Sequence, residues 1–304
     1  MKALVIGYGS IGQRHTRLLE ELGHQVAVFS RRSIERPLRY SHLEEALLKW
    51  QPDYVVIANR TSEHYEVLKI IFETEFRGLV LVEKPLFDKY IKVPQNHFSK
   101  IAVAYNLRFH PLLQQLKQIV ESASKILTVN VYVGSYLPDW RAQIDYRKSY
   151  SASKQAGGGV LRDLSHELDY ISWIFGDWQS LTAIGGKISS LDINSDDAYC
   201  LLLETKCCPL VSINMNYLDR VPRREIAVNT DDQTIHINLV QNTITINTTQ
   251  RAIKLERDTT YIAEHQAMLE GNFNTLCSLK EASKTLLTIE AAEQAARLQT
   301  WIKL

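Results

Sequence analysis

A glycine-rich turn at the start of the chain constrains the fold more than any other stretch. The mostly apolar run Lys2-Ala3-Leu4-Val5-Ile6 precedes Gly7-Tyr8-Gly9-Ser10-Ile11-Gly12, and an amphipathic stretch up to Gly23 follows. This order predicts a buried strand, a tight turn and a helix. In such a turn the first glycine allows the sharp bend, the second lets the backbone approach a pyrophosphate, and the third lets helix and strand pack closely. We therefore expect residues 7–12 to bind a dinucleotide at the helix N-terminus, the alternative being a glycine turn without a nucleotide.

Bulk properties exclude several classes of function. The 304 residues predict about two domains, and the net charge of +1 gives no electrostatic basis for binding nucleic acid or a membrane surface. The apolar runs are too short to cross a bilayer. The four cysteines show neither a metal-binding spacing nor a disulfide framework, and Met1 leads directly into a strand. We expect a soluble protein without a signal peptide, in the cytoplasm.

Strands and helices alternate through the first third of the chain, which predicts a doubly wound parallel sheet. In such a sheet ligands bind at the carboxyl ends of the strands. Polar clusters follow the predicted strands at these ends. Most of the predicted cofactor-binding residues lie in these clusters, and His64 lies in the predicted helix that follows Thr61. They are Ser30, Arg31, Arg32, Ala58, Asn59, Thr61, His64, Glu83, Lys84 and Asn106.

The residues after the second strand bear on the choice of cofactor. A carboxylate usually stands there when NAD is bound, since it accepts from the ribose 2′-hydroxyl. Here the run is Ser30-Arg31-Arg32, and a hydroxyl with two guanidinium groups suits a 2′-phosphate. The run favours NADP; NAD with two solvated arginines is the alternative.

The pattern changes after about residue 121. Residues 126–136 alternate between apolar and polar, and further strands follow with few helices between them. We expect a dinucleotide-binding domain over residues 1–121 and an α+β domain over 122–304, with a mainly antiparallel, open-faced sheet. The fold class is therefore α/β followed by α+β. A capping box, Ser41-x-x-Glu44, is expected to open a helix in the first domain.

A predicted helix over residues 160–175 follows Gly157-Gly158-Gly159 and carries polar residues on one stripe. Asp163 precedes His166 by three positions, so the two side chains should touch on a continuous helix. A solvated acidic face with an incidental histidine is the alternative. An aromatic and basic loop before the glycines is expected to form a pocket wall or to pack between the domains; it contains Trp140, Arg141, Tyr146, Arg147 and Tyr150.

These motifs together resemble the glucose-fructose oxidoreductase/inositol dehydrogenase (Gfo/Idh/MocA) family. The resemblance rests on the glycine turn, Glu83-Lys84-Pro85, Tyr105-Asn106-x-Arg108-Phe109, and the triple glycine followed by Asp163, His166 and Asp169. It spans nearly the whole chain. It implies a Rossmann domain followed by an open-faced sheet through which such proteins commonly form homo-oligomers. It also implies that the closing helix returns to the first domain.

The resemblance implies an active site. Lys84 would be the central catalytic residue, with His166 and Asp163 as partners, because hydride transfer at a secondary alcohol needs a group that removes or supplies a proton. The predicted substrate-binding residues are Lys84, Arg108, Trp140, Arg141, Tyr146, Asp163 and His166. In most of the family the acid precedes the histidine by four positions, whereas here Arg162 stands there and Asp163 lies one residue later.

The sequence thus predicts an NAD(P)-dependent oxidoreductase acting on a hydroxyl or keto carbon of a sugar-like substrate: a sugar, sugar acid, cyclitol or nucleotide sugar. The arginines of the loop suit an anionic group on it. Three alternatives stay open: an NAD-dependent glycosidase of the same fold, a non-sugar reductase resembling the biliverdin reductases, and a non-catalytic NAD(P)-binding sensor.

Overall fold

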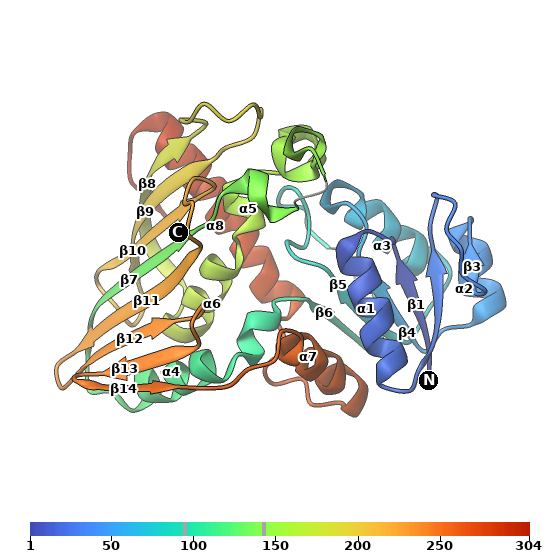
Figure 1. The fold of residues 1–304 in the computed structure, drawn as a ribbon, viewed down its shortest axis with the longest axis horizontal. Coiled ribbons are helices and arrows are strands. Elements are labelled where there is room, and N and C mark those ends of the chain that lie inside the picture. Colours follow the sequence, from blue (N-terminus) through green and yellow to red (C-terminus); the bar gives the residue numbers. More distant parts are fainter. Residues whose placement is uncertain (94–95, 142–143) are drawn as a thin grey trace. The chain divides into compact units, whose positions relative to one another are not determined.

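The computed structural model describes residues 1–93, 96–141 and 144–304 (Figure 1). The chain forms two compact units, each built from two segments. The first contains Met1–Phe109 and Asp258–Ser283, and the second contains His110–Arg257 and Lys284–Leu304. The sequence analysis placed one boundary at residues 121/122, whereas the chain passes from unit to unit after Phe109, Arg257 and Ser283.

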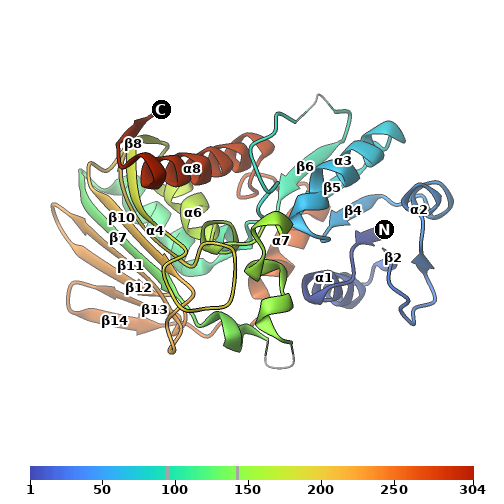
Figure 2. The ribbon, with the colours of Figure 1, turned by 90° about the horizontal axis from the view of Figure 1, so that it is seen from above.

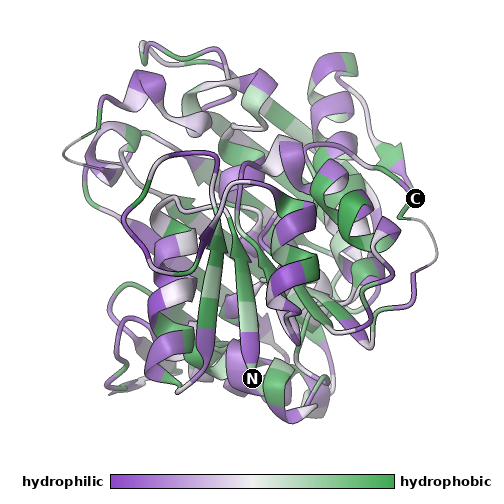
Figure 3. Cartoon of the chain, turned by 90° about the vertical axis from the view of Figure 1, so that its right-hand side faces the viewer, coloured by the Kyte–Doolittle hydropathy of each residue, from purple (hydrophilic) through white to green (hydrophobic). Residues whose placement is uncertain are grey.

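The first unit contains a parallel sheet with the order β3-β2-β1-β4-β5-β6. Figure 3 shows strands beside the N-terminus that are coloured as apolar along much of their length. Apolar residues on both faces of a strand are typical of parallel sheets, whose two faces are both covered. The strands are β1 (Lys2–Ile6), β2 (Gln25–Phe29), β3 (Arg39–Tyr40), β4 (Tyr54–Ile57), β5 (Leu79–Val82) and β6 (Lys100–Val103).

Helices far apart in sequence complete this unit. Besides the α-helices, its described residues include the short 3₁₀ segments η1 (Thr61–Glu63) and η2 (Asn106–Phe109). Residues Ala267 and Met268 of the late helix α7 pack in the same apolar core as Val5 and Val56. A segment after residue 257 is therefore part of the first unit's core. The α-helices are α1 (Ser10–Glu21), α2 (Leu43–Trp50), α3 (His64–Glu73) and α7 (Thr259–Glu270).

The second unit is built on a sheet with the order β14-β13-β12-β11-β7-β10-β9-β8-β15, in which β7 and β10 pair in parallel and the other pairs are antiparallel. The predicted mainly antiparallel sheet is confirmed. Its strands are β7 (Ile126–Gly134), β8 (Trp178–Gly186), β9 (Ala198–Thr205), β10 (Val211–Asn216), β11 (Arg223–Thr230), β12 (Thr234–Asn238), β13 (Thr243–Ile246), β14 (Thr249–Ala252) and β15 (Ile302–Lys303).

Helices cover one face of this sheet (Figure 2). These are α4 (Pro111–Ser122), α6 (His166–Phe175) and α8 (Leu279–Leu298), whose first residues belong to the first unit. No helix of the described residues lies over the opposite face. There Ile184 is 83% exposed and Leu202 is 43% exposed. The remaining helical segments are α5 (Val160–Asp163), η3 (Leu137–Trp140), η4 (Tyr146–Lys148), η5 (Tyr150–Ala152) and η6 (Lys154–Ala156).

Two local predictions are wrong. The continuous helix expected over residues 160–175 is broken, because Leu164 leaves the helical conformation (φ −99°, ψ 25°) and α6 starts anew at His166. Residues on every side of this segment are buried, so the polar stripe in the sequence does not correspond to an exposed helix face. The expected capping box also fails, since α2 begins at Leu43 after His42, which makes no side-chain capping hydrogen bond.

The packing of Gly12 gives a test of the fold. A Cβ at this position would overlap the carbonyl oxygen of Gly7, which belongs to the backbone and has little room to move. We expect Gly12→Ala to lower the free energy of unfolding by about 2–3 kcal/mol, because overpacking against backbone outweighs the better helix propensity of alanine. Urea denaturation measures the change, with Gly23→Asn as the control in open space. An unchanged transition midpoint would show that helix and turn do not pack closely.

Candidate active site

The register of the parallel sheet places the carboxyl ends of its strands in one row. Ile6 pairs with both Phe29 and Ile57, Ile57 pairs with Val82, and Val82 pairs with Val103. The backbone hydrogen bonding continues one residue past each strand. The carbonyl oxygen of the last residue of the neighbouring strand accepts from the N–H group of Gly7, Ala58, Glu83 or Ala104. The polar clusters predicted at the strand ends therefore share one edge of the sheet.

The glycine turn lies at the centre of this edge. Gly7 has φ +98°, and a Cβ there would come within 2.7 Å of the Asn59 backbone. Gly9 precedes α1 as its N-cap, has an extended backbone and would place a Cβ in open space. The N-terminus of α1 is thus left clear above the turn, which is the cradle that a pyrophosphate needs. Ser10, Ile11 and Gly12 form the first turn of α1.

Tyr8 in this turn contacts Arg36, which the sequence analysis missed. The Arg36 guanidinium lies 5.7 Å from the centroid of the Tyr8 ring and donates to its hydroxyl at 3.2 Å. It also pairs with Glu20 of α1. The pair extends the glycine turn toward the segment after β2, where Ser30, Arg31 and Arg32 lie.

Basic side chains gather at the end of β2. The Ser30 hydroxyl is buried and accepts from the Arg32 N–H at 3.1 Å, so it shapes the turn. Arg31 is exposed and lies 3.6 Å from Glu63. Arg39 of β3 donates to the Ser30 carbonyl. The two-residue strand β3 brings Arg39 next to Ser30, so Arg39 belongs to the basic cluster as well. Glu63, from the turn after β4, is a carboxylate neighbour of this cluster.

The turn after β4 combines a buried amide with a buried histidine. The Asn59 amide donates to Glu63 at 3.1 Å, while its Oδ1 is buried without a hydrogen-bond partner among the described residues. The His64 ring contacts the carbonyl oxygens of Leu86 and Asn59, at 3.1 and 3.3 Å. His64 thereby joins two loops of the edge, and burial lowers the pKa of its imidazole. Thr61 is buried at the start of η1.

Glu83 and Lys84 follow β5, and a cis peptide bond joins Lys84 to Pro85. The backbone N–H of Lys84 donates to Glu83 Oε2 at 3.1 Å. The Glu83 carboxyl is buried, which raises its pKa, but the hydrogen bond and the electrostatic interaction with His15, followed by the nearby charge of Lys84, outweigh burial, so the pKa lies below its ordinary value. Glu83 is accordingly an anion beside Lys84.

Asn106 and Arg108 lie in η2, at the end of the row. Asn106 donates to the Thr260 hydroxyl of α7 at 2.7 Å. Arg108 is 2% exposed and pairs with Glu281 at 2.8 Å, and this pair lowers the pKa of the Glu281 carboxyl despite its burial. These contacts tie η2 to the late segment of the first unit.

In the second unit, Asp163 ends α5 and His166 begins α6, so the helix break lies between them. Both are buried. Asp163 Oδ2 accepts from the Tyr217 hydroxyl at 2.6 Å. Burial and then the charge of Asp163 raise the pKa of Tyr217 and of Tyr150 well above the ordinary value for a phenol. Asp163 is thus held by two protonated phenols. Tyr150 belongs to the predicted loop, whereas Tyr217 was not among the predicted site residues.

Two residues of the predicted loop connect to this carboxylate through the same phenols. Trp140 packs edge-on against Tyr217, with ring centroids 5.1 Å apart, and the Arg141 guanidinium lies 5.8 Å from the Tyr150 ring. Tyr146 does not join the group; its hydroxyl accepts from the Asp192 N–H at 3.2 Å.

The triple glycine explains how the loop that carries Tyr150 packs against the start of α5. A Cβ at Gly158 would overlap the Tyr150 carbonyl oxygen, and one at Gly159 would overlap the Asp196 carboxylate. Asp196 in turn accepts from the Leu161 N–H at 3.2 Å at the start of α5. The glycines therefore allow the chain to approach itself. Arg162, the residue where the family acid would stand, pairs with Glu293 of α8 at 2.7 Å.

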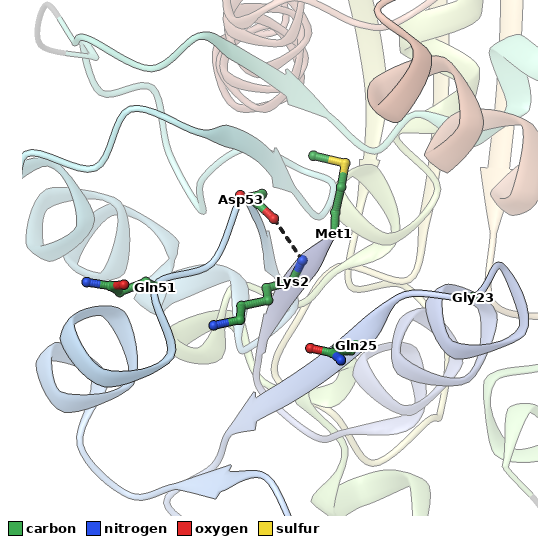
Figure 4. A pocket seen from close by; sticks show the side chains of 6 residues that line it. All are labelled: Met1, Lys2, Gly23, Gln25, Gln51 and Asp53. Carbon is green, nitrogen blue, oxygen red and sulfur yellow. Dashed lines mark hydrogen bonds between the residues drawn. The ribbon is translucent and has the colours of Figure 1, made fainter.

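The first unit also has a surface pocket away from this edge. The pocket in Figure 4 lies at the amino ends of β1, β2 and β4, opposite the polar row. No group of three His, Cys, Asp or Glu side chains in the described ranges could hold a metal ion. No helix there is long and apolar enough to cross a membrane. The pocket is lined by Met1, Lys2, Gly23, Gln25, Gln51 and Asp53.

Comparisons with known proteins agree with this architecture. An oxidoreductase of Thermotoga maritima is 19% identical with a TM-score of 0.83, covering 100% of this chain and 98% of that one. The WlbA dehydrogenase of Bordetella pertussis, solved with NADH and UDP-GlcNAcA, is 17% identical with a TM-score of 0.80 and the same coverage. A levoglucosan dehydrogenase solved with NADH and levoglucosan is 14% identical with a TM-score of 0.83, covering 100% and 99%. At these identities the likeness shows the fold.

Sequence comparison identifies the family. A Synechocystis oxidoreductase is 31% identical over 157 residues, which are 47% of this chain and 40% of that protein, so the chain matches less than half of the length of this curated relative. The model of the oxidoreductase family with an NAD-binding Rossmann fold matches residues 1–95, and the model of the GFO/IDH/MocA C-terminal domain matches residues 113–239. The chain therefore belongs to the Gfo/Idh/MocA family of oxidoreductases, with an NAD-binding Rossmann domain at its N-terminus.

Proposed function

We propose that this protein is an NAD(P)-dependent dehydrogenase or reductase that acts on a hydroxyl or keto carbon of a sugar-like substrate. The observation that carries the proposal is the single edge on which the open N-terminus of α1, the buried Asn59 Oδ1 and Lys84 all lie. Asn59 Oδ1 needs a hydrogen-bond donor that the described residues do not provide, and a ribose hydroxyl or a carboxamide is such a donor.

The chain's own residues have distinct roles in this proposal. When bound, the nicotinamide accepts or supplies the hydride. The first turn of α1 binds the phosphates, and Asn59 orients the neighbouring sugar or amide. Lys84 takes the hydroxyl proton during oxidation and returns it during reduction. An amine suits this step because neighbouring groups readily move its pKa toward neutrality.

His166 and Asp163 complete the proposed set in the second unit. A histidine can exchange a proton near neutral pH, and we propose that His166 does so with the same substrate. Asp163 is held by Tyr217 and interacts with Tyr150, and we propose that its carboxylate orients a substrate hydroxyl or the imidazole. Trp140 and Arg141 would contact the substrate, with Arg141 favouring an anionic group.

The substrate class and assembly also belong to this proposal. The WlbA and levoglucosan dehydrogenase structures contain a nucleotide-sugar derivative and an anhydrosugar, which supports a sugar-like substrate here. The uncovered sheet face exposes Ile184 of β8 and Leu202 of β9, and we propose a homo-oligomer through this face. The four free cysteines are compatible with the cytoplasm.

Gly9→Ala tests the dinucleotide site apart from the fold. Because a Cβ at Gly9 meets nothing within 4 Å, unfolding in urea should match the original protein. The methyl group would instead overlap a pyrophosphate, so NADH affinity should fall about tenfold or more, a cost on the order of 1–3 kcal/mol. Fluorescence titration with NADH measures this. Unchanged affinity with unchanged stability would place the dinucleotide elsewhere.

Arg31→Ala tests the preference for NADP. The substitution should weaken NADPH by about 1–3 kcal/mol, the scale of a charge-assisted hydrogen bond, and leave NADH nearly unchanged. Parallel titrations with the two nucleotides measure the difference. Arg77→Ala, which removes the same charge from an exposed position after α3, is the control. Equal losses for both nucleotides would contradict a 2′-phosphate contact.

Lys84→Ala tests the chemistry on a panel of free sugars, sugar acids, cyclitols and nucleotide sugars, each with NAD⁺ and NADP⁺. We expect turnover, followed by absorbance, to fall about 10²–10⁴-fold on whichever substrate reacts. Lys89→Ala, an exposed lysine nearby, should retain full activity. Substrate consumption without net reduced nucleotide would indicate the glycosidase, and activity independent of Lys84 would contradict its catalytic role.

A further inference from the structure

Four buried side chains of the first unit form a continuous hydrogen-bonded chain that ends beside Lys84. The Tyr54 hydroxyl lies 3.0 Å from His265 Nδ1, His265 Nε2 lies 2.9 Å from His15 Nδ1, and His15 Nε2 lies 2.8 Å from Glu83 Oε1. Tyr54 comes from β4, His265 from α7, His15 from α1, and Glu83 from the turn after β5. Tyr54, His15 and His265 are completely inaccessible to solvent.

The chemistry of the groups gives the chain a direction. An ionised carboxylate only accepts hydrogen bonds, so His15 donates to Glu83 through Nε2. Burial lowers the pKa of His265 well below its ordinary value and raises that of Tyr54, so the imidazole is neutral and the phenol keeps its proton. In the order that we propose, the hydroxyl donates to His265 Nδ1, and His265 Nε2 donates to His15 Nδ1. Every polar atom of the chain has one partner when the protons are arranged in this order.

We propose that this chain holds Glu83 ionised and in place, and that Glu83 in turn fixes the backbone and the charge state of Lys84. His15 is thus a positioning residue that acts through Glu83. The proposal rests on the catalytic role proposed for Lys84. Its structural basis is the Lys84 N–H bond to Glu83 Oε2, opposite the oxygen that His15 binds.

The location of His15 gives the chain a second consequence. α1 carries the open N-terminus proposed for the phosphates and, one turn further on, His15. The hydrogen bond to Glu83 therefore ties the phosphate-binding helix directly to the turn of Lys84. A leucine at position 15 would fill the space but leave Glu83 and His265 buried without these partners, which is costly.

The other charged and titratable groups that face the chain come from the neighbouring elements. Glu83 also interacts with Lys84, with His64 of α3 and with Tyr261 of α7, and His265 interacts with His24. Glu264 of α7 faces Tyr54 and Tyr261. His15 hydrogen-bonds the Glu83 side chain from another element, α1. Its removal should therefore leave burial as the dominant influence on that carboxyl.

Two substitutions of similar shape distinguish the hydrogen bond made by His15 Nε2 from the one made by His15 Nδ1. A glutamine amide reaches the position of Nε2 and can still donate to Glu83, whereas an asparagine amide reaches only the position of Nδ1 and contacts His265. In His15→Asn, Glu83 should take up a proton near neutral pH, and the loss of its charge should lower the titration midpoint of the Lys84 amine by about one pH unit. His15→Gln should keep the original midpoint.

The midpoint is measured by NMR of the protein with ¹³C-methylated lysines, and the Lys84 signal is identified by its loss in Lys84→Ala. Leu47→Ala, a buried substitution in α2, serves as the control that lowers stability without touching the chain. Glu83→Gln should lower the Lys84 midpoint as His15→Asn does, and it provides the comparison if His15→Asn does not fold. Equal midpoints in all variants, or equal shifts in His15→Asn and His15→Gln, would overturn the proposal.

Imidazole ¹⁵N shifts test the direction of the chain in the original protein. We expect both His15 and His265 to carry their proton on Nε2 at neutral pH, and a proton on Nδ1 of either would overturn the proposed order. These measurements need no substrate. Full activity of Lys84→Ala would refute the catalytic role of Lys84 and leave the titration result intact. Loss of activity in Lys84→Ala with equal Lys84 midpoints in all variants would refute only the role of His15.

Discussion

The parallel register of the first sheet is the constraint on which the candidate site depends. Because Ile6, Phe29, Ile57 and Val82 end their strands side by side, the residues that follow each of them leave the sheet at the same edge. A shift of one strand by a residue would reverse its side chains and move its turn out of the row. Hydrophobic burial of both faces thus positions polar groups that are far apart in the sequence.

Much of the first unit could be predicted from the sequence because its signals are local. An apolar pentad, three glycines at fixed spacing and a helix pattern describe a single structural unit, and Gly7 and Gly12 meet the backbone contacts that such a turn requires. His15, in contrast, has no sequence signal for its role. Its partners are Glu83 and His265, and only the folded chain brings α1, β5 and α7 together.

The second unit was less predictable because burial on all sides removes the periodicity that sequence analysis uses. Residues 160–175 are apolar or buried on both faces, so the break at Leu164 and Ser165 leaves no pattern. The spacing of Asp163 and His166 therefore did not describe their geometry. Tyr217 was similarly hidden, because it directly follows β10 and its hydroxyl reaches Asp163 only through tertiary packing.

The interleaving of the two units has a consequence for how such a protein can evolve. Helix α7 is separated from β6 in sequence by the long first segment of the second unit, His110–Arg257, yet Ala267 and Met268 pack in the same core as Val5 of β1 and Val56 of β4. A gene segment that ended at Phe109 would encode a sheet with part of its apolar face uncovered. The nucleotide-binding unit is consequently not a segment that recombination can exchange in one step. Its transfer to another scaffold requires three simultaneous junctions, after Phe109, Arg257 and Ser283, and the inserted sheet and α7 must come from the same parent.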